Sequence, residues 1–172
     1  MPDFVICPLG NGTTTLPMSK LFKAMNRDIK AVGFEAVSSA FAYRKKFLGK
    51  YESVFNSVKP ELIKRHNLPG TTPAKAIFAA PALEQSLEYL DDIKLVTNDY
   101  IDANFLEATG KLPKFYSKEV TQLGTNNLKI LEDFGRTGVA GFDVAVDVAR
   151  KNNLQRKQFL IPVFDASWHY DN

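Results

Sequence analysis

The chain has 172 residues, of which 45% are apolar and 24% charged, and its net charge is +3. This composition supports a hydrophobic core and excludes global disorder, and the length suits a single domain over residues 1–172. The one cysteine, Cys7, excludes a disulfide framework within the chain. The first residues lack the features of a secretory signal, and no apolar run reaches 18 residues, so we expect a cytoplasmic or virion protein without a membrane partner.

The first third of the chain predicts a strand, a loop and two helices. Residues 3–9 are mostly apolar and indicate a strand, and the Gly, Asn and Thr residues at 10–15 indicate a loop. The apolar residues that follow have helical spacing, which predicts a helix that ends at Gly33. Over residues 34–56 Phe and Leu recur every seven positions, which favours a second helix, although residues 34–43 also suit a strand.

The rest of the chain predicts further helices and a terminal strand. Helical spacing indicates five more segments, 61–66, 74–80, 81–108, 117–134 and 142–153. The apolar run at 158–164 indicates a strand. The expected fold is therefore mainly α, a bundle of about five helices with short strands near both termini that could pair with each other, and the alternative is an α+β fold.

Three glycines, Gly135, Gly138 and Gly141, stand at three-residue spacing after the predicted helix 117–134. Each would cost a helix roughly 1 kcal/mol relative to Ala. Either the helix is interrupted there, as at a hinge, or a neighbouring element packs very close to it.

Charge is divided along the chain. Residues 1–75 carry a net charge of +7, residues 76–149 carry −6, and the C-terminal arm 150–172 carries +2. The opposite charges either neutralise each other within one fold or lie on different surfaces. In the second case copies could dock head-to-tail, or the basic part could hold a polyanion.

The loop of Gly10, Asn11, Gly12, Thr13 and Thr14 lies between a predicted strand and a predicted helix. This context suits an anionic ligand, because backbone N–H groups and a helix N-terminus favour negative charge. The residues complete no known phosphate motif, so an ordinary surface turn is the alternative.

The same region resembles the opening of a known family. The run PLGNGTT at 8–14, followed by Ser19 and by a helix ending with GFE at 33–35, resembles the start of the small ferredoxin-like thiamine-binding proteins. The resemblance covers about 30 of the 172 residues, and this chain has two extra residues before Ser19 and long acidic segments in its second half. The resemblance implies a vitamin-sized ligand near the loop.

Two clusters of basic residues suit a phosphate backbone, because bases alternate with aromatic residues in the first of them. The expected polyanion-binding residues are Arg44, Lys45, Lys46, Lys50, Lys64, Arg65, Arg150 and Lys151. A solvated basic helix face is the alternative, since no zinc-finger spacing or RNA-recognition motif accompanies them.

The sequence shows no catalytic or metal-binding constellation. Cys7 lies in an apolar strand, where an inert buried thiol is expected. His66 and His169 have no metal-ligand partner at useful spacing, and Asp143 and Asp147 share a helix face without a third ligand. We therefore expect no catalytic residue, no metal and no cofactor.

These observations lead to a hypothesis of a non-enzymatic, self-assembling structural protein, such as a coat or filament-type subunit. It would form homo-oligomers through its charged surfaces and terminal strands, with nucleic acid as a partner of its basic half. One alternative is a small-molecule or anion-binding protein that uses the loop at 10–15. The other is an enzyme of unrecognised type, which the poor inventory of nucleophiles and bases disfavours.

Overall fold

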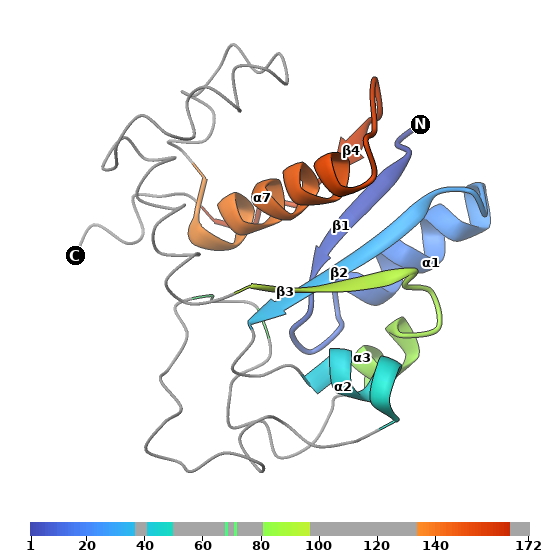
Figure 1. Ribbon diagram of the computed structural model, residues 1–172. Helices are drawn as coiled ribbons and strands as arrows, with labels where there is room; N and C mark the ends of the chain where they lie inside the picture. The colour runs from blue at the N-terminus through green and yellow to red at the C-terminus, as the bar shows by residue number, and fades with distance from the viewer. Residues whose placement is uncertain (37–40, 50–67, 69–70, 72–80, 97–133, 166–172) are drawn as a thin grey trace.

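The computed structural model describes residues 1–36, 41–49, 68, 71, 81–96 and 134–165 (Figure 1). Within these ranges the chain forms a four-stranded parallel sheet in the order β3-β2-β1-β4, with helices on both faces. The elements are β1 (Phe4–Pro8), α1 (Thr15–Met25), β2 (Lys30–Ala36), α2 (Phe41–Leu48), α3 (Pro81–Ser86), β3 (Asp92–Val96), α7 (Arg136–Lys151) and β4 (Phe159–Leu160).

The expected mainly α bundle is wrong, and so is the α+β alternative, because the described residues form an α/β fold around a parallel sheet. The misleading segment is β2, in which six of seven residues are buried. A parallel strand covered on both faces lacks the polar alternation of a surface strand, and its continuous apolar run resembles a helix segment. The all-parallel sheet also differs from the ferredoxin-like unit that the N-terminal resemblance implied.

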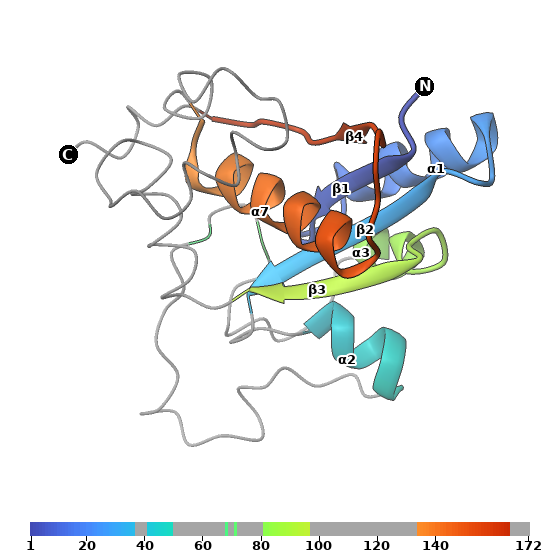
Figure 2. The ribbon, with the colours of Figure 1, turned by 45° about the horizontal axis from the view of Figure 1, so that its top comes forward.

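Different helices pack on the two faces of the sheet (Figures 1 and 2). Successive strand side chains point to opposite faces, so Val5 and Cys7 pack against α1 while Ile6 packs against α7. On the α7 side, Val144 and Phe34 belong to the larger core cluster. The short helices α2 and α3 join the α1 side through a cluster that contains Leu9, Ala31, Phe41, Ala42, Leu83, Leu90 and Ile93.

The predicted pairing of the terminal strands is confirmed. β1 and β4 are parallel neighbours, with Phe4 opposite Phe159, and their rings stack with centroids 4.7 Å apart. The C=O of Gln158 accepts from Phe4 N–H, so alternate residues after it also face β1. The next such donor beyond Leu160 would be Pro162, which has no N–H, and this explains why the ladder is shorter than the predicted strand 158–164.

The glycines do not interrupt their helix, because α7 runs unbroken through Gly138 and Gly141 from an N-cap at Gly135. The close-neighbour interpretation is correct. A Cβ at Gly141 would lie 2.8 Å from Ile161 Cγ2, and one at Gly138 would lie 3.5 Å from Val163 Cγ1. The glycines therefore let the segment after β4 lie against α7, and Figure 2 shows this segment running back towards the start of the helix.

Two predicted helices in the first third are corrected. α1 ends at Met25, because Asn26 is extended, and Gly33 lies inside β2 and is not a helix cap. In place of a helix over 34–56, the structure has the end of β2 and then α2. Residues 37–40 and 50–56 lie outside the described residues.

The second half requires further corrections. The predicted helix 81–108 is limited to α3, which is followed by β3, and its remainder from 97 lies outside the described residues. The prediction for 142–153 is met by α7 as far as Lys151. The segments 61–66 and 74–80 and the predicted helix 117–134, apart from its last residue, also lie outside the described part. Among the described helices, none is long and apolar enough to cross a membrane.

Ion pairs link the basic first part of the chain to the acidic part. Lys23 Nζ lies 2.7 Å from Asp91 Oδ2, and Lys30 Nζ lies 3.6 Å from Asp91 Oδ1. At least here, the opposite charges neutralise each other within one molecule.

Candidate functional site

The loop of residues 10–14 lies at the carboxyl end of the sheet, directly after β1. β1 is central, with β2 on one side and β4 on the other. The chain adds β2 and then β3 on one side of β1, and it later adds β4 on the other side. The strand order therefore reverses at β1, which makes its carboxyl end a topological switch point. In open α/β sheets ligands bind at such points, outside the carboxyl ends of the strands.

Short polar contacts define the shape of this loop. Asn11 Oδ1 accepts from the Thr13 N–H at 3.0 Å and from the Thr13 hydroxyl at 2.7 Å. The buried Thr15 hydroxyl donates to Pro8 O at 2.8 Å, and the buried Ser19 hydroxyl donates to Thr15 O at 2.7 Å. These bonds fix the first turn of α1 against the end of β1.

Gly12 holds the loop against α3. Its φ is +87°, in the left-handed region, and a Cβ there would lie 2.5 Å from Leu83 Cα and overlap the backbone of Ala82. The Leu16 N–H donates to Gly12 O at 2.9 Å, which joins the loop to α1. Only glycine satisfies both the conformation and the close approach at this position.

Several donors of the loop are not used by the protein itself. In the described part of the chain, no hydrogen bond uses the N–H of Asn11, Gly12 or Thr14. The first turn of α1 contains no acidic residue, and the Thr14 side chain makes no capping bond. Unused N–H groups at a helix N-terminus favour an anion.

The start of α7 differs from the start of α1. Its N-cap Gly135 donates its N–H to Asp165 O at 2.8 Å, and the Asp165 carboxylate lies so close that a Cβ on Gly135 would overlap it. A carboxylate at a helix N-terminus offsets the positive end of the helix dipole. This helix start therefore already has an anion from the chain itself.

Glu35 is a buried carboxylate at the carboxyl end of β2, and no motif in the sequence indicates its role. Oε2 accepts from the N–H groups of Phe41 and Ala42 at 3.0 and 3.3 Å, and Oε1 accepts from Tyr43 N–H at 2.7 Å. Burial raises the pKa of Glu35 to about 7, against the opposing effect of these three bonds. Its contacts make it the N-terminal cap of α2.

The predicted polyanion-binding residues do not form one surface among the described residues. Arg44, Lys45 and Lys46 lie on α2, which packs on the α1 side of the sheet, and Lys46 Nζ donates to Leu87 O at 2.7 Å. Arg150 and Lys151 end α7 on the other side of the sheet, and Lys151 pairs with Asp147 at 2.8 Å. The remaining three, Lys50, Lys64 and Arg65, lie outside the described residues. Polyanion binding stays a prediction.

Two further residues considered in the sequence, Cys7 and Asp143, are buried. Cys7 is fully buried in β1, and burial raises the pKa of its thiol to about 12. Asp143 is buried on α7, as expected from the predicted helix over 142–153. Within the described ranges no group of three His, Cys, Asp or Glu residues could hold a metal ion.

Comparison by sequence finds nothing, since no family model and no curated protein matches the chain. Comparison by structure finds enzymes. Serine racemase from Dictyostelium discoideum matches with a TM-score of 0.60 at 17% identity, over 96% of this chain and 44% of that one. O-acetyl serine sulfhydrylase isoform 3 from Entamoeba histolytica matches with a TM-score of 0.62 at 15% identity, over 99% and 39%.

A hydrogen sulfide-producing enzyme from Fusobacterium nucleatum has a TM-score of 0.61 at 20% identity, over 98% of this chain and 44% of that one. At these identities the likeness establishes the α/β fold alone. The chain spans less than half the length of each of these three proteins.

The hypothesis of a coat or filament-type structural subunit, and with it the virion assignment, is wrong. It described a helical domain, and the chain instead shares a parallel α/β fold with enzymes that are named for reactions of serine, O-acetyl serine and hydrogen sulfide. The structure and these neighbours fit the alternative better, a protein that binds a small molecule at the loop after β1.

Proposed function

We propose that this chain is a small-molecule-binding domain of the enzyme type, and that residues 10–14 seat an anionic, phosphate-like group of the ligand. The observation that carries this proposal is the start of α1. It lies at the switch point of the sheet, has unused N–H groups, and contains no acidic residue of its own. The start of α7, which Asp165 covers, serves as an internal contrast.

The class of ligand follows from the neighbours and from the loop together. Racemising serine requires removal of the proton on its α-carbon, and pyridoxal phosphate supplies the electron sink that stabilises the resulting carbanion. The phosphate of that cofactor suits the loop, because Asn11, Gly12 and Thr14 offer N–H groups and no carboxylate competes in the first turn of α1. Pyridoxal phosphate is therefore our leading candidate ligand.

The chain's own residues would hold and orient the ligand. The Asn11–Thr13 bonds shape the loop, and Gly12 keeps it against α3. Since the chain covers under half of each neighbour, our proposal is limited to binding, and the reacting groups are not assigned.

Thermal unfolding with and without ligand tests the proposal. We expect inorganic phosphate at millimolar concentration to raise the Tm, and pyridoxal phosphate to raise it more than pyridoxal, which lacks the phosphate. A ligand present at 100 times its Kd stabilises the folded state by about 2.7 kcal/mol. Equal effects of pyridoxal and pyridoxal phosphate, together with no effect of phosphate, would refute the proposal.

A matched pair of variants tests whether the phosphate group binds at this loop. Thr13 is exposed, so Thr13→Glu adds a negative charge beside the loop, and Thr13→Gln is its uncharged control. Both variants lose the hydroxyl bond to Asn11 and keep the backbone bond from the Thr13 N–H, so the two differ in charge alone. We expect the charged variant to lose the phosphate effect and the control to keep it. Gly12→Val is unsuitable, because overlap with Leu83 would unfold the loop whatever it binds.

A further inference from the structure

The outer edge of β4 and of the residues that follow it, as far as Val163, carries backbone groups that the described residues leave unused. Since Gln158 O and the alternate residues after it face β1, Phe159, Ile161 and Val163 turn their N–H and C=O groups outward. None of the hydrogen bonds of the described residues uses the N–H of Ile161 or Val163. An edge of this kind is a template for a further strand.

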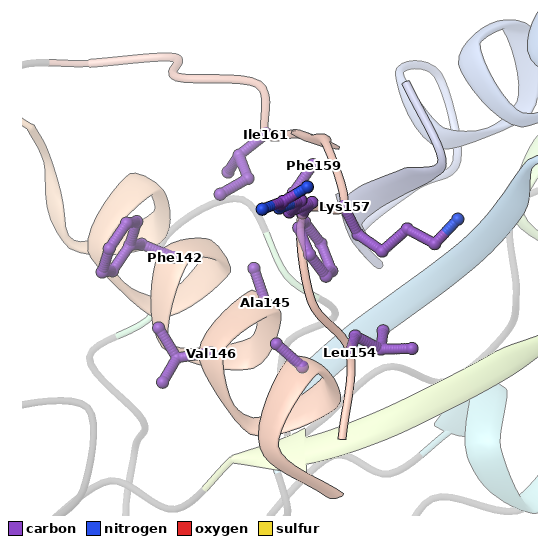
Figure 3. Close-up of a pocket in the computed structure, with 9 residues that line it drawn as sticks. Phe142, Ala145, Val146, Leu154, Lys157, Phe159 and Ile161 are labelled. Carbon is purple, nitrogen blue, oxygen red and sulfur yellow. The ribbon is translucent and has the colours of Figure 1, made fainter. Parts of the chain in front are cut away.

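The side chains along this edge are apolar and exposed. Leu160 is 36% exposed, Val163 44% and Phe164 49%. Beside them a groove of about 260 Å³ lies between α7 and β4, with Phe142 and Val146 on its helix side and Phe159 and Ile161 on its strand side (Figure 3). The surface therefore offers both backbone bonds and a place for apolar side chains.

The opposite edge of the sheet is protected in the usual way. β3 carries Asp92 and Lys94, whose charged groups are 2.6 Å apart, and charged side chains discourage edge-to-edge pairing. β4 and the residues after it include no charge between Phe159 and Val163. The difference marks β4 as the edge built to pair.

We propose that a second copy of this chain pairs with β4 in antiparallel orientation, centred on Ile161, to form one continuous sheet across a twofold axis. In this register Ile161 faces its own counterpart, and Phe159 faces Val163 of the other copy. Both are hydrogen-bonded pairs, because all three residues turn their backbone groups outward. Pro162 falls in the intervening pair that needs no N–H, so it does not oppose the arrangement.

The side chains support the self-paired register. Phe159, Ile161 and Val163 all point to the α7 face, since Ile161 and Val163 approach Gly141 and Gly138. The same residues of a second copy would therefore enter the groove beside Phe142 and Val146. The register places Lys157 opposite Asp165, and it brings no like charges together.

Sedimentation equilibrium of the whole chain tests this dimer, over concentrations from about 1 to about 500 μM. Val163→Lys should raise the dimer dissociation constant at least about tenfold, because it would bury an unpaired ammonium group. Phe47→Lys is the control, since Phe47 is 45% exposed on α2, which packs beside β3 at the other edge. Circular dichroism verifies that both variants are folded.

Competing peptides test the backbone pairing directly. A peptide of residues 157–165 should dissociate the dimer, and N-methylation at Ile161 should abolish this effect because it removes an outward N–H. N-methylation at Leu160, whose N–H faces away from the seam, should leave the competition intact. A monomer at every concentration, or a dimer that neither Val163→Lys nor the peptide weakens, would overturn the proposal.

Discussion

The two ends of the sheet are built from different interactions. At the amino end, partly exposed charges meet, with Lys157 Nζ 2.8 Å from Asp3 Oδ1 and Lys23 Nζ 2.7 Å from Asp91 Oδ2. At the carboxyl end, close backbone contacts and buried polar groups dominate, as at Gly12 against Leu83 and at Glu35 beneath α2. The amino end tolerates changes that solvent can screen, and the carboxyl end does not.

This difference indicates that substitutions are tolerated less well at the carboxyl end of the sheet than at the amino end. Exposed ion pairs are worth up to about 1 kcal/mol each, whereas an overlap or an unsatisfied buried group costs several times as much. Strict geometry at the carboxyl end is what a binding site requires, and it coincides with the loop that we propose as the ligand site.

The largest effect is expected at Gly12. Gly12→Val should lower the free energy of unfolding by about 3–5 kcal/mol, because a side chain there would overlap Ala82 and Leu83 and strain a positive φ. Urea unfolding measures the loss. Gly49→Ala is the control, since Gly49 also has a positive φ, +64°, but has nothing within 4 Å, and it should cost only about 1–2 kcal/mol. Equal losses would mean that the loop does not pack against α3.

An intermediate effect that depends on pH is expected at Glu35. Its folded pKa of about 7 exceeds the usual 4.5, so the folded state keeps a proton that the unfolded state loses between these values. Stability should therefore fall as pH rises from 4.5 to about 7, by about 3 kcal/mol at most. Glu35→Gln should remove this pH dependence and also cost roughly 1–2 kcal/mol, because an amide cannot accept all three backbone bonds.

Urea unfolding of both proteins at several pH values between 4.5 and 8 measures the difference. The comparison isolates Glu35, because any other group that titrates in this range is common to both proteins. The same slope in the variant as in the original chain would show that Glu35 is charged throughout.

The smallest effect is expected at Asp91, at the amino end. Partial burial raises its pKa, but the hydrogen bonds from Lys23 and the Ala31 N–H, and the charges of Lys23 and Lys30, bring the pKa below 3.8. Its contribution is therefore present above pH 3.8 and is lost as pH falls through the lowered pKa. Asp91→Asn can keep the bond from Ala31 and should cost about 0.5–1 kcal/mol, and less in about 1 M salt. A loss that salt does not change would show that charge is not its role.

The sequence predicted those parts of the fold in which neighbouring residues decide the structure. The apolar run of β1, the glycine-rich loop after it, the inert thiol of Cys7 and the tight packing at Gly141 were all foreseeable from residue type and spacing. β2 was not foreseeable, because a strand that is buried on both faces shows no alternation of apolar and polar residues. In addition, Phe34 in β2 and Phe41 in α2 belong to one seven-residue spacing, which favoured a single helix. β3 was not foreseeable either, because Leu83, Leu87 and Leu90 follow helical spacing up to its start and predicted that the helix continued.

The loop of the candidate site could be predicted from the sequence, but the contacts that hold it in place could not. The five residues of the loop are consecutive, so its composition was enough to nominate it. The contacts that give it a fixed shape come from far along the chain. Leu83 lies against Gly12, and Asp165 lies against Gly135. No pattern among neighbouring residues in the sequence predicts either contact. Glu35 becomes a cap only because the chain returns to it at Tyr43.

The pairing of β1 with β4 also has a consequence for synthesis. Asp3 and Gln158 are joined by a hydrogen bond although they are 155 positions apart. The strand β1 is thus synthesised about 155 residues before its neighbour β4. At about 5–20 residues per second, one side of β1 waits roughly 8–30 seconds on the ribosome before that neighbour emerges. During this interval the half-built sheet exposes a bare apolar strand, which makes the nascent chain a natural client for a chaperone.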